Sequence, residues 1–410
     1  MDNQDRHNES NGGLKPSASN AFSGNKGMLL PDVPTGERKT EHVRLCLEEE
    51  VNGRDVTTGF EHYRFRHAAL PEVDFNDVNL ATSFLGFTTA TPLLISSMTG
   101  GSKVTGEINM RLAEAAERRG WVLGVGSIRA AVEREELAYT FRVRDKAPSI
   151  PVIANLGAVQ LNYGFGPDNC RRAVDIAGAD MLVLHLNSLQ EVFQPEGNTR
   201  FGGLLPKIEE LCQVIDVPVG IKEVGWGIDG MTARCLLDAG AAFIDVAGAG
   251  GTSWSQVEKF RCSDPVRRAA AEAFADWGNP TAECIAEVRE AAPSAVLIGS
   301  GGLKNGVDAA KALAIGADLA GFGRGLLGSA VSSEEALDQK LAQVELELRT
   351  AMFGIGYKGQ MYSRGKRGGA VSCLDWQRRV EKRRRCSQGT GDRRRSGRFW
   401  PRTARLSCVL

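Results

Sequence analysis

The sequence predicts an α/β protein built as a single (β/α)8 TIM barrel, and three observations lead to this prediction. Short apolar runs alternate with helical patterns roughly every 25 to 40 residues, which is typical of parallel strands joined by helices. Eight such runs are present, whereas open doubly wound sheets usually have about five or six strands. Each run ends in a glycine or polar motif, and in a barrel these ends converge on the face that carries active sites.

The eight expected strands are short apolar runs bounded by turn residues. They cover Pro92–Ser97, Trp121–Gly126, Pro151–Asn155, Met181–Leu186, Pro218–Lys222, Phe243–Val246, Ala295–Gly299 and Leu319–Phe322. Helices are expected between them. One is expected over Glu107–Arg119, where apolar residues at helical spacing share one face, and another over Gly306–Ile315.

The 410-residue chain divides into three regions by composition. Residues 1–36 are rich in Asn, Ser and Gly and are expected to form a disordered extension. Residues 37–357 contain all eight runs and are expected to fold as the barrel domain. Residues 358–410 carry 16 Lys and Arg against three acidic residues, a net charge of +13. We expect this last region to be a disordered basic tail, either an appended segment or the product of a reading-frame error.

The composition also argues against several classes of protein. No apolar run reaches the ~18 residues that span a bilayer, and the N-terminus lacks an apolar signal segment. The nine cysteines show no C-x-x-C spacing, which disfavours a zinc site or a disulfide framework. The net positive charge is confined to the tail, so nucleic-acid binding by the barrel is not expected. A cytoplasmic protein that does not associate with membranes is therefore expected.

Glycine-rich turns end the seventh and eighth strands. Gly299–Gly302, with the sequence Gly-Ser-Gly-Gly, precedes a helix, and Gly323 and Arg324 follow the last strand. Backbone N–H groups at a helix N-terminus bind phosphate well, and these two strands form the usual phosphate corner of barrels. We expect a phosphate here, and an ordinary left-handed turn is the alternative.

Lys222 ends the fifth strand after an apolar run, so its ammonium group should point into the mouth of the barrel. A purely structural role explains it poorly, because an unpaired buried ammonium is costly. A cation at this place suits the N1–C2=O edge of a flavin, where it would stabilise the anionic reduced ring. Schiff-base chemistry is the alternative.

A polar cluster follows the fourth strand. His185 ends the apolar run, and Asn187, Gln190 and Glu191 follow it closely. The cluster suits a diphosphate and a divalent metal, because one carboxylate together with substrate phosphate oxygens commonly holds Mg2+. In general, a histidine that closes an apolar strand is more often a hydrogen-bonded core residue.

Arg38 and Lys39, followed by His42, lie before the barrel at the start of an apparent helix that ends near Glu50. Two adjacent cations and a histidine suit a diphosphate. Spacing alone favours the alternative, in which they form a solvated helix face.

Taken together, these segments resemble the type II, FMN-dependent isopentenyl-diphosphate isomerases. The resembling stretches are Arg38–Val43, Arg64–Glu72, Pro92–Gly101, Gly126–Arg129, Ala154–Gly157, His185–Glu191, Pro195–Asn198, Ile221–Gly225, Gly250–Trp254 and Gly299–Gly302. They span residues 37–357, whereas the Arg-rich extension after Gly356 departs from the family.

The resemblance implies the cofactors and the residues that hold them. FMN is expected on Met98, Thr99, Gly100, Ser127, Asn155, Lys222 and Thr252, with its phosphate on Gly301, Gly302, Gly323 and Arg324. The small-molecule diphosphate is expected on Arg38, Lys39, Ser127, Arg129, His185, Asn187 and Gln190, with Mg2+ on Glu191. His185 and Gln190 are the catalytic candidates. NADPH is implied as the reductant of the flavin, and a homo-oligomer, a tetramer or larger, as the assembly.

The implied reaction moves a double bond within a five-carbon diphosphate, by adding a proton at C4 and removing one from C2. The quoted motifs offer no side chain acidic enough to protonate an alkene, since Gln190 is a feeble acid and Glu191 is assigned to the metal. This gap agrees with the family, in which reduced FMN acts as acid and base.

Three alternatives are open at this point. An FMN-dependent 2-hydroxy-acid oxidoreductase would use the same barrel, but it needs a histidine base near the seventh strand, and no histidine follows His185. A nucleotide dehydrogenase would need a loop cysteine near Gly299–Gly302, where none occurs. A catalytically silent binding protein would not need every site position to keep its chemistry.

Overall fold

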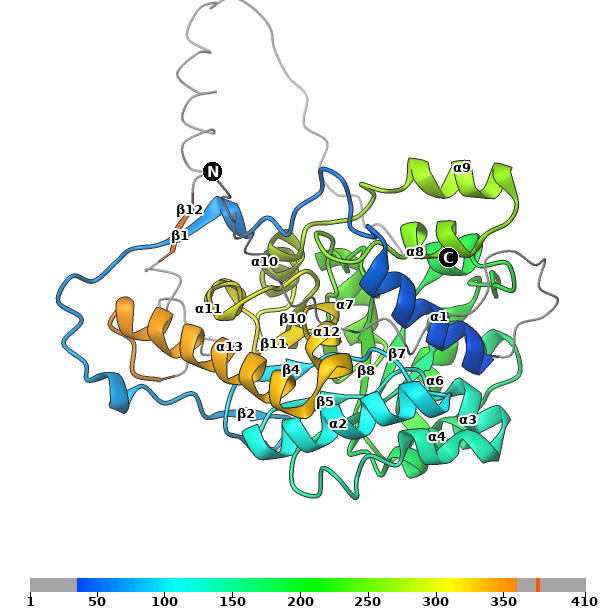
Figure 1. The fold of residues 1–410 in the computed structure, drawn as a ribbon, viewed down its shortest axis with the longest axis horizontal. Helices are drawn as coiled ribbons and strands as arrows, with labels where there is room; N and C mark the ends of the chain where they lie inside the picture. Colours follow the sequence, from blue (N-terminus) through cyan, green and yellow to red (C-terminus); the bar gives the residue numbers. More distant parts are fainter. Residues whose placement is uncertain (1–34, 360–373, 377–410) are drawn as a thin grey trace, which may run out of the picture. The chain divides into compact units, whose positions relative to one another are not determined.

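The eight expected strands form a closed parallel barrel in the computed structural model, which describes residues 35–359 and 374–376 (Figure 1). They are β4 (Leu93–Ile95), β5 (Val122–Gly124), β6 (Val152–Gly157), β7 (Met181–His185), β8 (Val219–Lys222), β9 (Phe243–Asp245), β10 (Val296–Ser300) and β11 (Leu319–Phe322). Each strand pairs with the next along the chain, and β11 pairs with β4 to close the ring. The predicted (β/α)8 barrel is confirmed.

Helices surround the barrel (Figure 1). They are α1 (Thr35–Glu48), α2 (Lys103–Arg119), α3 (Arg129–Glu133), α4 (Pro167–Ala177), α5 (Ser188–Phe193), α6 (Leu204–Val214), α7 (Gly230–Asp238), α8 (Trp254–Arg261), α9 (Pro265–Ala273), α10 (Thr281–Ala291), α11 (Gly306–Ile315), α12 (Arg324–Ser332) and α13 (Glu334–Gly354). Among the described residues, no helix is long and apolar enough to cross a membrane.

All three helices expected from the sequence are present, and one is longer than expected. The helix before the barrel is α1, which ends at Glu48, close to the expected Glu50. The helix over Gly306–Ile315 is α11, with the expected ends. Helix α2 begins at Lys103 rather than at Glu107. The earlier start has a local cause: Ser102 Oγ accepts a hydrogen bond from the Thr105 N–H (3.3 Å), and the Ser102 N–H donates to Thr105 Oγ1 (3.0 Å). This reciprocal capping satisfies two N–H groups of the first turn.

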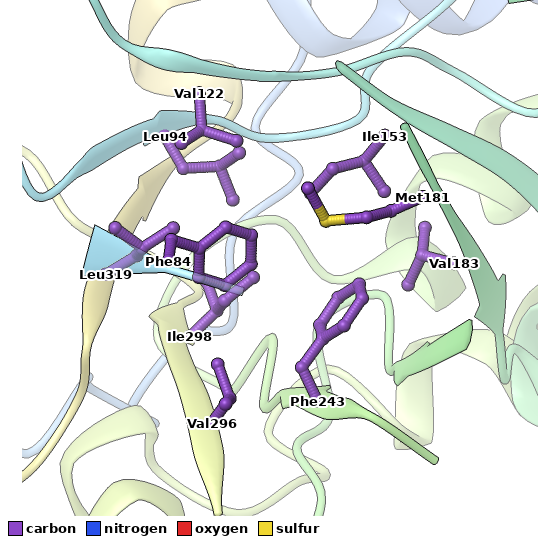
Figure 2. Packing of buried hydrophobic residues seen from close by; sticks show 10 residues of the cluster. All are labelled: Phe84, Leu94, Val122, Ile153, Met181, Val183, Phe243, Val296, Ile298 and Leu319. Atoms are coloured by element: carbon purple, nitrogen blue, oxygen red, sulfur yellow. The ribbon is translucent and has the colours of Figure 1, made fainter. Parts of the chain in front are cut away.

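A hairpin plugs the N-terminal end of the barrel. Its strands β2 (Thr82–Phe84) and β3 (Phe87–Thr89) are antiparallel and are joined by Leu85 and Gly86, both with positive φ. The fully buried Phe84 ring packs edge-on against Phe243 at 5.8 Å between ring centroids (Figure 2). Gly220 makes this possible, because a Cβ there would lie 2.2 Å from the Phe243 ring. These two rings belong to a buried apolar cluster of Phe84, Leu94, Val122, Ile153, Met181, Val183, Phe243, Val296, Ile298 and Leu319 (Figure 2). We call the hairpin and this cluster the plug.

The two ends of the chain lie largely outside the described residues. This applies to the expected N-terminal extension over residues 1–36, apart from the first two residues of α1, and to most of the expected tail over residues 358–410. The described part of the tail includes a short strand, β12 (Leu374–Trp376), which pairs antiparallel with β1 (Tyr63–Phe65). Both expectations about the ends remain predictions.

Candidate active site

A polar layer lies above the plug inside the barrel. His185, Lys222 and Asp245 end β7, β8 and β9 and pair with one another in register. They stand two residues after Val183, Gly220 and Phe243, which belong to the plug or pack against it. Side chains two apart on a strand share one face. We call these three residues the floor. They lie at the C-terminal ends of the strands, where barrel enzymes carry their chemistry.

A cavity of about 490 Å3, the main cavity, opens over the floor. Eight of the eleven predicted cofactor residues line it, namely Met98, Thr99, Lys222, Thr252, Gly301, Gly302, Gly323 and Arg324. The other three lie elsewhere. Ser127 lines a neighbouring cavity, Asn155 contacts His185, and Gly100 packs against Phe141. Asn155 and Gly100 therefore contribute to the shape of the site but do not line this cavity.

One corner of the main cavity is shaped to admit a phosphate. Gly301 and Gly302 have left-handed backbones, with φ of +108° and +72°, and a Cβ at either would lie within 2.5 Å of a backbone carbonyl oxygen. Only glycine fits there, which lets a ligand approach the backbone closely. Helix α12 begins beside this turn, and its first residue, Arg324, donates a hydrogen bond to Asn52 Oδ1. A helix N-terminus and an arginine both favour an anion.

Two hydroxyl groups in the same region have no protein partner. Ser96 Oγ and Thr99 Oγ1 are buried and make no hydrogen bond within the part of the chain that the structure describes. Both residues line the main cavity. Buried polar groups are nearly always satisfied, so these hydroxyls suit the polar edge of a bound cofactor. The donor set of the main cavity thus fits FMN.

A smaller cavity adjoins the main one, and we call it the side cavity. It gathers all of the predicted substrate and metal residues: Arg38, Lys39, Ser127, Arg129, His185, Asn187, Gln190 and Glu191. Lys39 and His42 line both cavities. These two residues come from α1, which packs against α2, α8 and α12. The two predicted sites are therefore neighbours.

The Glu191 carboxylate is buried and oriented by hydrogen bonds to both oxygens. Asn187 Nδ2 donates to Oε1 (2.9 Å), and the Asn198 N–H donates to Oε2 (2.5 Å). Each carboxylate oxygen keeps a lone pair for a metal ion. Within residues 35–359, no group of three or more His, Cys, Asp or Glu side chains could hold a metal. A metal at Glu191 would therefore need ligand oxygens from a substrate.

His185 is held as a neutral imidazole. Its Nδ1 lies 2.8 Å from Asn155 Oδ1, and because an amide oxygen only accepts hydrogen bonds, Nδ1 carries the proton. Burial, together with the positive charges of Lys222 and Lys39, lowers the pKa of His185 to about 3. At neutral pH this residue offers the Nε2 lone pair to a ligand and has no proton to spare as an acid.

Lys39 also has a shifted pKa. Burial and the positive charge of Arg38 lower it to about 8, although Glu258 and Glu191 oppose the shift. The ammonium group is thus charged at neutral pH but is incompletely balanced by the protein. An anion bound between the two cavities would complete the charge balance.

A buried charged cluster joins His42 on α1 to Glu258 and Arg261 on α8, and the sequence reasoning missed the last two residues. His42 Nε2 lies 3.0 Å from Glu258 Oε1, and Arg261 Nη1 donates to Glu258 Oε2 (2.6 Å). Gln190 Nε2 also donates to Glu258 Oε1 (3.1 Å). Burial alone would raise the pKa of Glu258, but His42, Arg261 and Gln190 outweigh it and lower the pKa to about 2. Glu258 is therefore a permanent anion beside the side cavity.

Arg261 makes two further ion pairs outside the cluster. Its Nε donates to Glu41 on α1 (2.9 Å) and its Nη2 to Glu196 (3.2 Å), which also accepts from Arg38 Nη1 (3.1 Å). Glu258 and Arg261 follow the Gly250–Trp254 motif on α8. That proximity was the one signal that could have revealed them.

Comparisons with known proteins define the class. Residues 35–145 and 187–361 match the family model described as FMN-dependent dehydrogenase. A mandelate oxidase structure superposes with a TM-score of 0.53 at 21% identity, covering 74% of this chain and 86% of that one. A lactate oxidase structure from Pediococcus acidilactici gives 0.54 at 17% identity, with coverage of 75% and 85%. At these identities the structures establish the fold alone. Fold and family model together define an FMN-dependent barrel protein.

Sequence relatives narrow the class to one family. The isopentenyl-diphosphate delta-isomerase of Oceanobacillus iheyensis is 55% identical over 320 residues, 78% of this chain and 92% of that protein. The enzyme of the same name from Nostoc sp. is 51% identical over 322 residues, with coverage of 78% and 92%. The chain belongs to the isopentenyl-diphosphate delta-isomerase family, and the resemblance seen in the sequence is confirmed.

Proposed function

We propose that this chain interconverts isopentenyl diphosphate and dimethylallyl diphosphate by an allylic proton shift, with reduced FMN in the main cavity and Mg2+ on Glu191. The observation that supports this most is the contact between two cavities of different chemistry. One fits FMN, and the other gathers the predicted diphosphate residues around Glu191. Reduced FMN, when bound, supplies the proton-transfer group that the side chains lack.

The chain's own residues position the substrate and neutralise its charge. Arg38, Lys39 and Arg129 line the side cavity and supply cations for the diphosphate. Neutral His185 accepts a hydrogen bond there. Trp254 lies at the boundary with the main cavity, with its ring 5.1 Å from that of His42. Together these side chains exclude water from a developing tertiary cation, because water would otherwise add to that cation.

An oxidoreductase acting on 2-hydroxy acids is the weaker candidate. It shares the barrel, as the mandelate and lactate oxidase structures do. Its chemistry needs a histidine base beside the substrate carbon near the seventh strand, and no histidine follows His185. Burial lowers the pKa of His185 to about 3, so its free Nε2 is a weak base. We further propose NADPH as the reductant, a homo-oligomer as the assembly and a cytoplasmic location, each of which rests on the family resemblance.

The flavin spectrum of the protein and the amount of NADPH consumed per product molecule test the proposed function. Purified protein mixed with FMN is expected to show the yellow flavin spectrum, and reduced protein with Mg2+ should convert isopentenyl diphosphate to its allylic isomer, followed by NMR. NADPH consumption should be far below one per product molecule. Consumption of one NADPH per product would support the oxidoreductase, and failure to bind FMN would overturn both.

Substrate capture is expected to weaken above about pH 8, because Lys39 then loses its proton. The lowered pKa belongs to the free enzyme, so kcat/KM for isopentenyl diphosphate should fall by up to about tenfold per pH unit beyond that point. Lys39→Arg is the matched control, since arginine stays protonated. The same fall in Lys39→Arg as in the unaltered protein would show that Lys39 is not responsible.

Glu191→Gln is expected to raise the Mg2+ concentration for half-maximal activity by about tenfold or more, because an amide oxygen binds a hard cation less well than a carboxylate. The FMN dissociation constant, measured by fluorescence quenching, should stay within about threefold. Glu210→Gln, an exposed site on α6, serves as control. An unchanged Mg2+ requirement in Glu191→Gln would place the ion elsewhere.

A further inference from the structure

Asp245, the third residue of the floor, is a buried carboxylate that the proposed reaction does not use. It ends β9 and is 3% exposed. Its backbone pairs in register with that of Lys222 on β8, so the two side chains project to the same side from neighbouring strands. Lys222 lines the main cavity, whereas Asp245 does not reach its surface. The carboxylate therefore lies beneath the cavity, beside its cation.

Two hydrogen bonds hold the Asp245 carboxylate in place. Ser300 Oγ, at the end of β10, donates to Oδ1 (2.6 Å), and the Ala247 N–H donates to the same oxygen (3.3 Å). Ala247 has a left-handed backbone (φ +38°) although it carries a Cβ, and it lines the main cavity together with Ser300. Such a conformation persists only where neighbouring contacts impose it. Asp245 thus fixes the loop and the strand that frame the floor.

The electrostatics of the floor follow from this arrangement. Burial raises the pKa of Asp245, while the Lys222 charge and the two hydrogen bonds oppose the rise. In a region of low dielectric constant, a carboxylate beside an ammonium group reduces the positive potential that the ammonium exerts on its surroundings. A flavin ring above the floor would feel the sum of the two charges rather than Lys222 alone.

We propose that Asp245 is a positioning residue that acts through Lys222 by partly offsetting its charge, and thereby sets how strongly the main cavity favours reduced, anionic flavin. This inference rests on the proposed binding of FMN in the main cavity. It explains why a carboxylate is buried below a site that otherwise gathers cations. It also predicts the sign of the effect: without the carboxylate, Lys222 stabilises the anionic reduced ring more, so the flavin becomes easier to reduce.

The test is the midpoint potential of bound FMN in Asp245→Asn, measured by equilibration with reference dyes. The variant keeps the shape and one acceptor oxygen but removes the charge. At a fixed potential, the ratio of reduced to oxidised flavin should rise about tenfold, which is ~30 mV for a two-electron couple. The FMN dissociation constant should change by less than about threefold. If Asp245→Asn does not fold, Asp245→Ser also removes the charge, and the same shift is expected.

Two controls separate this role from a merely structural one. Asp318→Asn removes another buried carboxylate, which pairs with Arg289 (3.1 Å) outside the cavity lining, and it should lower stability without moving the potential. In a Lys222→Met background, Asp245→Asn should no longer raise the potential, because the cation through which it acts is gone. An equal shift in both backgrounds, or none in either, overturns the inference. Failure of the unaltered protein to bind FMN would instead count against the proposed function.

Discussion

Deleting residues 1–43 should reduce turnover by about a hundredfold or more, whereas deleting residues 1–34 should leave it nearly unchanged. The longer deletion removes the part of α1 that carries Arg38, Lys39 and His42, and Lys39 and His42 line both cavities. Each charge-assisted contact to a diphosphate is worth ~1.5–3 kcal/mol. Two such contacts account for the expected loss. Steady-state turnover of isopentenyl diphosphate measures it.

Point variants and a third truncation sharpen this prediction. Arg38→Gln combined with Lys39→Gln should reproduce most of the loss, while Arg44→Gln, on the same helix and paired only locally with Glu48, should not. A chain ending at Gly359 should keep its activity, since every site residue precedes that point. Full activity without Arg38 and Lys39 would show that activity does not require these residues. An inactive chain ending at Gly359 would show that activity requires residues after that point.

Glu258→Gln should destabilise the protein by ~3–5 kcal/mol at pH 7, because it leaves the buried Arg261 without its closest carboxylate. Urea unfolding measures the loss. Glu48→Gln is the control, because its ion pair with Arg44 is exposed and spans one helical turn; such pairs contribute only about 0.2–0.5 kcal/mol. A loss as small as that of the control would mean that Gln190 and water satisfy the cluster without the charge.

The same carboxylate gives a pH signature with a defined sign. Its pKa is about 2 in the folded protein against 4.5 as its ordinary value. A depressed carboxyl pKa contributes stability that is fully present above the unfolded value and lost as pH falls through the folded value. Glu258 should therefore contribute stability above about pH 4.5 that is lost as the pH falls towards 2. Glu258→Gln should flatten the stability profile within this window.

The barrel was predictable because its strands are buried on both faces and therefore appear as continuous apolar runs. The glycine turns and the His185–Glu191 cluster were predictable for the same reason, because they come directly after these apolar runs. Glu258 and Arg261 could not be predicted so directly. Trp254–Arg261 has the polar composition of a solvated helix, and the packing of α1, α5 and α9 against α8 buries its charges. The β2–β3 hairpin was also missed, since its strands are three residues long and Leu85-Gly86 is not a typical hairpin turn.

Because of the plug, packing limits substitutions at the N-terminal end of the barrel, whereas ligand binding limits them at the mouth. Phe84 and Phe243 close the N-terminal end without touching either cavity. Thermal resistance and chemistry can therefore be selected independently in this fold, because substitutions that refit the plug change the melting temperature while the geometry of the floor persists. For protein engineering, the plug is the place to raise heat tolerance first, and the mouth of the barrel is the place to alter substrate range afterwards.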